Sequence, residues 1–247
     1  MNLVVDIGNS LIKTAVMDGG EAVDVRRYEI FEREDAMALA AEYPSLERAI
    51  VASTGQDTAR VAAILREAGL RVLQMSHSTA VPIGNGYRTP QTLGVDRLAA
   101  AVGAVCVMGC RDCVIVDFGT AITIDLVEGG VFRGGNISPG VRTRFRALHD
   151  YTERLPECEP TEVQLTIGGT TREAIEQGVM QGITHEIEGY IRDFMQSNAK
   201  LSLIFTGGDA KYFVKRIKNA IFAKCDLVFC GLNTILEYNA SIEEDIF

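Results

Sequence analysis

The sequence predicts an α/β protein built from two duplicated lobes. Two stretches follow one plan, strands alternate with helices through the first half, and the 247 residues, 47% of them hydrophobic, suffice for a core in each lobe. The aspartates of the two stretches, Asp6 and Asp117, lie 111 residues apart, close to half of the chain. We therefore expect an N-terminal lobe over 1–110 and a C-terminal lobe over 111–247, meeting at a cleft.

Each repeated stretch reads as a strand, a tight turn and a second strand. Leu3–Lys13 (LVVDIGNSLIK) and Val114–Asp125 (VIVDFGTAITID) both carry a buried β-branched run that ends in aspartate, with a glycine two residues later and then a small polar residue. A carboxylate at the exit of a buried strand is costly unless a cation meets it. Glycine allows the turn and the close approach of a ligand, and backbone N–H groups can hold phosphate oxygens. The two hairpins predict a site for the phosphates of ATP.

The first half continues with strands expected at 23–28, 48–53 and 71–75 and helices at 34–43 and 57–68. The segment 76–93 is rich in proline and glycine, which predicts an irregular loop. Leu98–Met108 is apolar nearly all round, which predicts a buried helix. Asp96 and Arg97 then occupy its first turn. They can act on a ligand, or Asp96 can simply oppose the helix dipole while Arg97 forms a salt bridge.

The second half contains a strand from residue 131, and Gly134–Gly140 leads into a helix for which Ser138 is the expected N-cap. Thr170 and Glu173 fit a capping box. If the Thr170 hydroxyl caps the backbone, Thr171 remains available for a ligand. The helix should run toward residue 195, and its glycines indicate close packing or an interface.

The last part of the chain predicts a strand at 201–205, then Thr206-Gly207-Gly208 and a helix to Ala220. A strand, a double glycine and a helix can cradle a nucleotide, although many strand–helix turns carry two glycines. A short strand at 227–229 and a final helix at 232–238 complete the expected elements.

Composition excludes several classes of protein. A net charge of -9 argues against general affinity for nucleic acid or an anionic membrane. We see neither an apolar run of the ~18 residues that a spanning helix needs nor a signal peptide, and we expect a cytoplasmic protein. The six cysteines include a single CxxC, at Cys110 and Cys113, so they read as small hydrophobes more readily than as a zinc site.

In combination, these motifs resemble the actin, sugar-kinase and Hsp70 ATPase superfamily, and within it type III pantothenate kinases. The resemblance covers almost the full length and implies two actin-like (ribonuclease H-like) lobes with an ATP cleft between them. It is carried by Asp6-Ile7-Gly8-Asn9-Ser10 with Lys13, Gly94-Val95-Asp96-Arg97, Asp117–Asp125, Gly134–Gly140 and Thr206-Gly207-Gly208.

The resemblance implies ATP-dependent phosphorylation of pantothenate, the first step of coenzyme A biosynthesis. It also implies a homodimer that requires Mg²⁺ and a monovalent cation, K⁺ or NH₄⁺. Asp96 would be the general base, Asp117 the monovalent-cation ligand and Asp6 would face the magnesium. The implied ATP-binding residues are Asp6, Ile7, Gly8, Asn9, Ser10, Leu11, Ile12, Lys13 and Thr120. The implied pantothenate-binding residues are Tyr87, Gly94, Val95, Asp96, Arg97 and Thr171.

The chain departs mildly from the family pattern. Ser10 stands where threonine is commoner, and Gly168–Thr171 matches the substrate-threonine region only loosely, so Thr171 is preferred to Thr170 partly on the capping argument. One rival hypothesis is a kinase of another small hydroxyl substrate. A second is a non-catalytic regulatory relative, which we would expect to have lost a phosphate-site or base residue.

Overall fold

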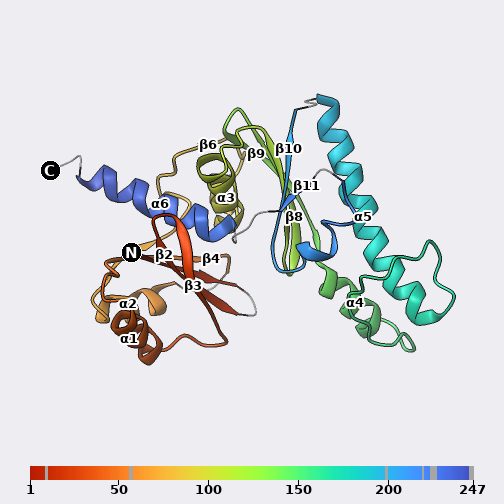
Figure 1. Ribbon diagram of the computed structural model, residues 1–247, viewed down its shortest axis with the longest axis horizontal. Coiled ribbons are helices and arrows are strands. Elements are labelled where there is room, and N and C mark those ends of the chain that lie inside the picture. The colour runs from red at the N-terminus through yellow and green to blue at the C-terminus, as the bar shows by residue number, and fades with distance from the viewer. Residues whose placement is uncertain (9–10, 56–57, 198–199, 219, 223–226, 245–247) are drawn as a thin grey trace. The chain divides into compact units, whose positions relative to one another are not determined.

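The computed structural model describes residues 1–8, 11–55, 58–197, 200–218, 220–222 and 227–244. The chain divides into two compact α/β units (Figure 1). Unit 1 consists of Met1–Arg111, Gly130–Phe132 and Cys225–Phe247, and unit 2 of Asp112–Gly129 and Arg133–Lys224.

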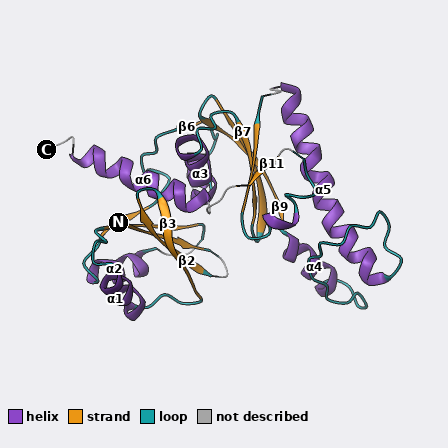
Figure 2. Cartoon of the chain, viewed as in Figure 1, coloured by secondary structure: helices purple, strands orange, loops and turns teal. Residues whose placement is uncertain are grey.

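Unit 1 is built on a mixed sheet with the strand order β3-β2-β1-β4-β5. Its strands are β1 (Asn2–Ile7), β2 (Ile12–Asp18), β3 (Glu21–Tyr28), β4 (Arg48–Ser53) and β5 (Arg71–Gln74). Its helices are α1 (Arg33–Glu42), α2 (Ala59–Glu67), α3 (Val95–Val102) and α6 (Leu227–Glu244). The α1–α2 pair covers one face of the sheet, and α3 and α6 cover the other (Figures 1 and 2).

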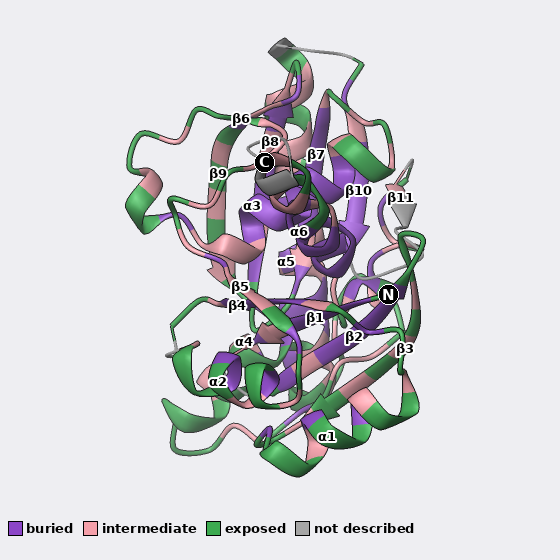
Figure 3. Cartoon of the chain, turned by 90° about the vertical axis from the view of Figure 1, so that its left-hand side faces the viewer, coloured by how far each residue is buried: buried purple, intermediate pink, exposed green. Residues whose placement is uncertain are grey.

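The central strands of unit 1 are buried on both faces because helices cover both. Leu3, Val4 and Val5 of β1 have no exposed surface, and Figure 3 shows β1 and β4 as largely buried. Such strands read as continuous runs of β-branched and apolar residues rather than as an alternating pattern. This is why the sequence revealed β1 and β4 clearly.

Unit 2 is built on β7 (Cys113–Phe118), β8 (Ala121–Glu128), β9 (Val131–Pro139), β10 (Ser202–Thr206) and β11 (Ala220–Phe222), in the order β11-β10-β7-β8-β9. Its helices are α4 (Val141–Asp150) and α5 (Thr171–Ser197). The apolar side of α5, including Met180, Ile183 and Ile187, packs with the buried residues of β7, β8 and β10. The rings of Phe118 and Phe213 stack in this core with centroids 4.7 Å apart.

One short strand of unit 1 pairs with the beginning of β9. β6 (Gly84–Asn85) runs parallel to Val131 and Phe132, which belong to unit 1 as well. The Gly86 N–H donates to the Phe132 carbonyl at 2.8 Å, so the pairing extends into the irregular loop. It fixes the loop segment that precedes Tyr87.

The C-terminal part of the chain differs from the expectation. Leu227–Phe229, expected to be a strand, is the first turn of α6. A three-residue apolar run carries no period that separates strand from helix. The expected ranges, 1–110 and 111–247, also differ from the two units, because α6 packs against β1, β4 and α3 and so belongs to unit 1.

Two further local predictions were wrong. The expected helix to Ala220 is limited to a 3₁₀ turn over Ala210–Tyr212 among irregular turns. Its lysines, arginine and alanines are good helix formers, so propensity favoured a helix, and the burial of Phe213 and Ile217 in the core of unit 2 overrides that weak preference. Ser138 is not the N-cap of α4, because β9 continues to Pro139 and Gly140 takes that position.

Within the described part of the chain, no helix combines the length and the apolar character that crossing a membrane requires. α5, the longest, carries charged residues along its length and has one side packed on the unit 2 sheet.

Candidate active site

The first hairpin places two opposite charges across from each other. Asp6 at the end of β1 and Lys13 in β2 are register partners, so their side chains leave the same face of the sheet. The Gly8 N–H donates to the Leu11 carbonyl at 3.1 Å and closes the turn. Asn9 and Ser10, two of the expected ATP-binding residues, lie outside the described residues. The hairpin therefore carries an aspartate and a lysine side by side next to its turn.

The remaining expected residues of this hairpin differ in how they can meet a ligand. The side chains of Ile7 and Ile12 are buried in the core of unit 1, so only their backbone groups are available for a phosphate. Leu11 is exposed at the turn. A contact from Ile7, Leu11 or Ile12 to phosphate would thus use N–H donors, which suit anionic oxygens.

The second hairpin repeats the plan with a shorter turn. Asp117 pairs across the ladder with Thr123, six positions later, whereas Asp6 and Lys13 are seven apart. The turn closes when the Gly119 N–H donates to the Ala121 carbonyl at 3.1 Å, and Thr120 is exposed at its tip. The residue opposite the second aspartate is an uncharged threonine rather than a lysine.

Two glycines hold other segments of unit 2 against this second turn. Gly207, with φ +92°, follows β10, and a Cβ atom there would overlap the Asp117 carboxylate and the Phe118 backbone. Gly140 lies against the other side, where a Cβ atom would overlap the carbonyl oxygens of Gly119 and Thr120. The double-glycine turn and the end of the Gly134–Gly140 segment, predicted separately, therefore meet at one hairpin.

The orientation of the Thr120 turn is fixed by hydrogen bonds to its backbone. The Thr120 carbonyl accepts from the Gly140 N–H at 3.0 Å and from the Thr143 hydroxyl at 2.8 Å. These bonds use the carbonyl of Thr120 and leave its side chain exposed. The hydroxyl is thus available at the tip of the turn for a phosphate oxygen.

The first turn of α3 carries a carboxylate and a guanidinium side by side. Gly94 is the N-cap, which confirms that Asp96 and Arg97 lie in the first helical turn. The Arg97 N–H donates to the Asp96 carboxylate at 2.8 Å. A Cβ atom at Gly94 would collide with that carboxylate, so glycine at this position lets Asp96 fold back over the start of the helix.

Arg97 is a buried cation, 6% exposed. The centre of its guanidinium lies 5.7 Å from the ring centroids of both Tyr87 and Phe132. The structure thus places the Tyr87 ring beside the Arg97 guanidinium. Phe132 was missed by the sequence analysis, which read it only as part of a strand.

Burial raises the pKa of the Asp96 carboxyl, and the hydrogen bond from the Arg97 N–H and the charge of Arg97 oppose that rise only in part. A general base is most effective when its pKa lies near the working pH. The environment of Asp96 therefore shifts its pKa in the direction that favours proton abstraction.

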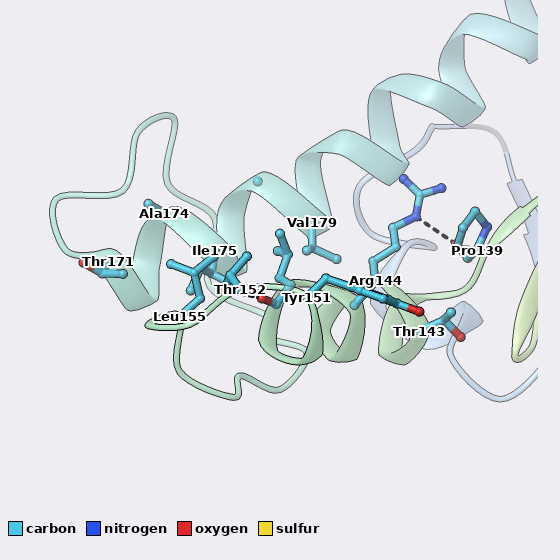
Figure 4. Close-up of a pocket in the computed structure, with 13 residues that line it drawn as sticks. Pro139, Thr143, Arg144, Tyr151, Thr152, Leu155, Thr171, Ala174, Ile175 and Val179 are labelled. Atoms are coloured by element: carbon cyan, nitrogen blue, oxygen red, sulfur yellow. Dashed lines mark hydrogen bonds between the residues drawn. The ribbon is translucent and has the colours of Figure 1, made fainter.

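Thr171 lies at the N-terminus of α5, beside a capping box that the sequence predicted correctly. The Glu173 N–H donates to the Thr170 hydroxyl at 3.2 Å, and the Thr170 N–H donates to the Glu173 carboxylate at 3.1 Å. The Thr170 hydroxyl is occupied by this cap. The exposed Thr171 lines an open, largely apolar groove of about 840 Å³ between α4 and α5 (Figure 4).

Among the residues that the structure describes, no three His, Cys, Asp or Glu side chains gather as candidate ligands of one metal ion. Cys113, one member of the CxxC pair, is buried in β7. Asp6 and Asp117 each supply a carboxylate at the end of a strand, which is the kind of oxygen ligand that Mg²⁺ and K⁺ take.

The model of the type III pantothenate kinase family matches residues 2–193 of the chain. The chain belongs to the type III pantothenate kinase family. Type III pantothenate kinases from Phocaeicola vulgatus and Flavobacterium johnsoniae are 40% and 36% identical to it over 240 residues. These alignments cover 97% and 96% of this chain and 99% and 98% of the two relatives. The chain is therefore a kinase, a transferase that uses ATP.

Solved structures agree with this family's fold. A Baf family transcriptional activator from Campylobacter jejuni is 22% identical with a TM-score of 0.64, covering 97% of this chain and 99% of that one. A 2-dehydro-3-deoxygalactonokinase protein from Sinorhizobium meliloti is 12% identical with a TM-score of 0.59, covering 97% and 99%. At these identities the similarity concerns the fold alone. It confirms the two-lobed α/β fold that type III pantothenate kinases share with sugar kinases.

The raised pKa of Asp96 gives a prediction for stability. An unfolded aspartate has a pKa of about 3.9. Because the folded protein raises that value, ionised Asp96 destabilises the fold above the folded pKa, and the effect vanishes below the unfolded pKa. Asp96→Asn should therefore unfold at a higher temperature than the wild type near neutral pH, and the difference should shrink toward about pH 4.

Thermal unfolding followed by circular dichroism at both pH values measures this difference. Asp193→Asn, at an exposed position on α5, is the matched control and should leave the unfolding temperature nearly unchanged. A gain for Asp96→Asn that is equal at both pH values would contradict the assignment to ionisation.

Proposed function

We propose that the chain transfers the γ-phosphoryl group of ATP to the terminal hydroxyl of pantothenate, giving 4'-phosphopantothenate in the first step of coenzyme A biosynthesis. The observation that carries this proposal is the first turn of α3. There, a carboxylate of raised pKa stands beside a guanidinium buried against two rings, in a chain that belongs to the type III pantothenate kinase family. The working compartment is the cytoplasm.

The first hairpin is proposed to bind the phosphates of ATP. Lys13 provides positive charge, and backbone N–H groups of the turn provide donors for phosphate oxygens. In such sites Mg²⁺ is held by one or two carboxylates together with substrate phosphates, and the Asp6 carboxylate is an oxygen ligand of that kind. When bound, Mg²⁺ would neutralise charge on the phosphates. Residues 6–13 thus supply alignment and charge, which are the main requirements of phosphoryl transfer.

The second hairpin is proposed to serve the nucleotide and a monovalent cation. The exposed Thr120 hydroxyl at the tip of the turn is a phosphate contact. Asp117 is the ligand for K⁺ or NH₄⁺, and its carboxylate stands at a strand end where Gly207 brings backbone close. Carboxylate and carbonyl oxygens are suitable ligands for such ions.

The acceptor is proposed to bind at the start of α3. The Asp96 carboxylate takes the proton of the terminal hydroxyl while that oxygen bonds to the γ-phosphorus, and the bond from phosphorus to the bridging oxygen of ADP breaks. Arg97 holds the pantothenate carboxylate, for which a guanidinium offers two parallel N–H donors. The other proposed contacts to pantothenate are Tyr87, Gly94, Val95 and Thr171.

We also propose a homodimer in which a second copy of the chain occupies the groove between α4 and α5. The groove is lined mainly by apolar side chains, and Tyr151 at its edge is 88% exposed. Within the described part of the chain, nothing lies within 4 Å of a Cβ atom built at Gly178 or Gly182. These two glycines therefore do not serve packing inside one copy. A helix surface bare of side chains suits the close approach of a helix from a two-fold related copy.

Release of ADP tests the reaction. We expect turnover with Mg²⁺–ATP and K⁺ that depends on added pantothenate, and Asp96→Asn should reduce it by about 100-fold or more, the scale of general-base loss. A blank without pantothenate measures background ATP hydrolysis. Folded wild-type protein that shows no pantothenate-dependent turnover would refute the proposal in favour of another kinase substrate or a regulatory role.

Replacement of the monovalent cation tests Asp117. Turnover should be high in K⁺ and low in Na⁺ at equal ionic strength, and Asp117→Asn should lose this preference because the amide carries no charge. Both proteins are assayed at saturating pantothenate. Turnover of the wild type that is indifferent to K⁺ would leave the kinase intact and refute the cation site.

Substitution in the groove tests the dimer. Gly178→Glu places a charge in the groove, where the isolated chain has room for it, and should convert a dimer into a monomer in sedimentation velocity. Gly189→Glu, on the same helix but outside the groove lining, is the matched control and should remain dimeric. A monomeric wild type, or a Gly178→Glu variant that stays dimeric, would show that this groove is not the interface.

A further inference from the structure

Phe132 lies where two chemically different neighbours meet. Its side chain is fully buried, its ring centroid is 6.0 Å from that of Tyr87, and the Arg97 guanidinium is 5.7 Å from its centroid. Phe132 is 35 residues from Arg97 in sequence and comes from the first residues of β9, so neither α3 nor the loop before it contributes this ring. The guanidinium therefore has an aromatic neighbour from each of two separate segments.

Aromatic rings attract cations because the face of each ring carries negative charge density. The attraction is larger where water is excluded, and Arg97 is almost completely buried. A planar guanidinium carries a fork of N–H donors that matches a planar carboxylate. Two rings at equal distance restrict the position of the guanidinium more than one ring would.

The backbone of Phe132 supports the same arrangement. Its carbonyl accepts from the Gly86 N–H at 2.8 Å. Gly84 is the ladder partner of Val131, and the Gly84 N–H donates to the Gly130 carbonyl. The Tyr87 N–H in turn donates to the Asn85 side chain at 3.0 Å. The carbonyl of Phe132 thus anchors the loop that carries Tyr87, and its ring contacts Arg97.

We propose that Phe132 is a positioning residue for the substrate carboxylate: its ring holds Arg97 in the orientation that binds pantothenate and so contributes to the choice of a carboxylate-bearing acceptor. The inference rests on the proposed function, because it assigns the carboxylate of pantothenate to Arg97. Phe132 itself does not contact the substrate in this scheme. Its effect passes through Arg97.

The test compares two acceptors that differ only at the carboxylate. One is pantothenate, and the other is its alcohol analogue, in which CH₂OH replaces the carboxylate while the reacting hydroxyl is retained. Phe132→Leu keeps an apolar side chain and removes the ring. We expect kcat/KM for pantothenate to fall by about 3- to 30-fold, mainly through KM, while kcat/KM for the alcohol changes little. The ratio of kcat/KM for pantothenate to kcat/KM for the alcohol should therefore fall by the same factor.

Matched variants separate positioning from packing. Phe31→Leu removes another fully buried ring of unit 1, which packs edge-on against Tyr28 at 5.1 Å, and should leave the preference between the two acceptors unchanged. Phe132→Tyr keeps the ring and should retain the wild-type preference. Phe132→Met removes the ring with a more adaptable side chain and repeats the measurement if Phe132→Leu does not fold.

The outcomes distinguish this inference from the proposed function. A wild type without pantothenate-dependent turnover refutes the function and the inference together. A wild type that prefers pantothenate, with a Phe132→Leu variant that loses equal activity on both acceptors or loses none, refutes the inference alone. Loss of the preference in Phe132→Tyr would also refute it, because the ring is still present.

Discussion

The second hairpin depends on two positions, Gly207 and Gly140, where there is no room for a side chain. Gly207 touches the Asp117 carboxylate and Gly140 touches the carbonyls of Gly119 and Thr120, so a Cβ atom at either glycine would displace the turn. The end of β10 and the start of α4 can therefore clamp the turn from two sides. Backbone brought this close offers N–H and carbonyl groups to a ligand without the conformational freedom of long side chains. The hairpin is thereby organised before a nucleotide arrives.

Unit 1 holds its functional charges in a different way, through burial. Moving a guanidinium or a carboxylate out of water is costly unless other groups compensate. Arg97 obtains part of this compensation from the rings of Tyr87 and Phe132, and Asp96 obtains part of it from the N–H at the start of α3. The rise in the pKa of Asp96 shows that compensation there is incomplete. A carboxylate that is destabilised by burial binds a proton more readily. The burial that makes ionised Asp96 costly to the fold therefore also makes Asp96 a stronger base.

The sequence predicted local features well because local chemistry determines them. The capping box of Thr170 and Glu173 needs only two side chains three residues apart, and the buried strand at 48–53 needs only a continuous apolar run. The role of Phe132 could not be found in this way, because its contact with Arg97 depends on how two distant segments meet. The helical start of α6 at 227–229 was missed for a similar reason: its packing against unit 1, rather than its short apolar run, decides its conformation.

The duplicated hairpins also show how one plan can support two chemical roles. The register partner of Asp6 is Lys13, so the first hairpin pairs its carboxylate with a cation that can also attract phosphate. The shorter second turn brings Thr123 opposite Asp117, and this partner carries no charge. An aspartate whose ladder partner is neutral offers more negative potential to a bound ion than one opposed by a lysine. The opposing residue thus distinguishes the two hairpins: Lys13 adds positive charge for phosphate beside Asp6, whereas Thr123 adds none beside Asp117, which suits the proposed monovalent cation.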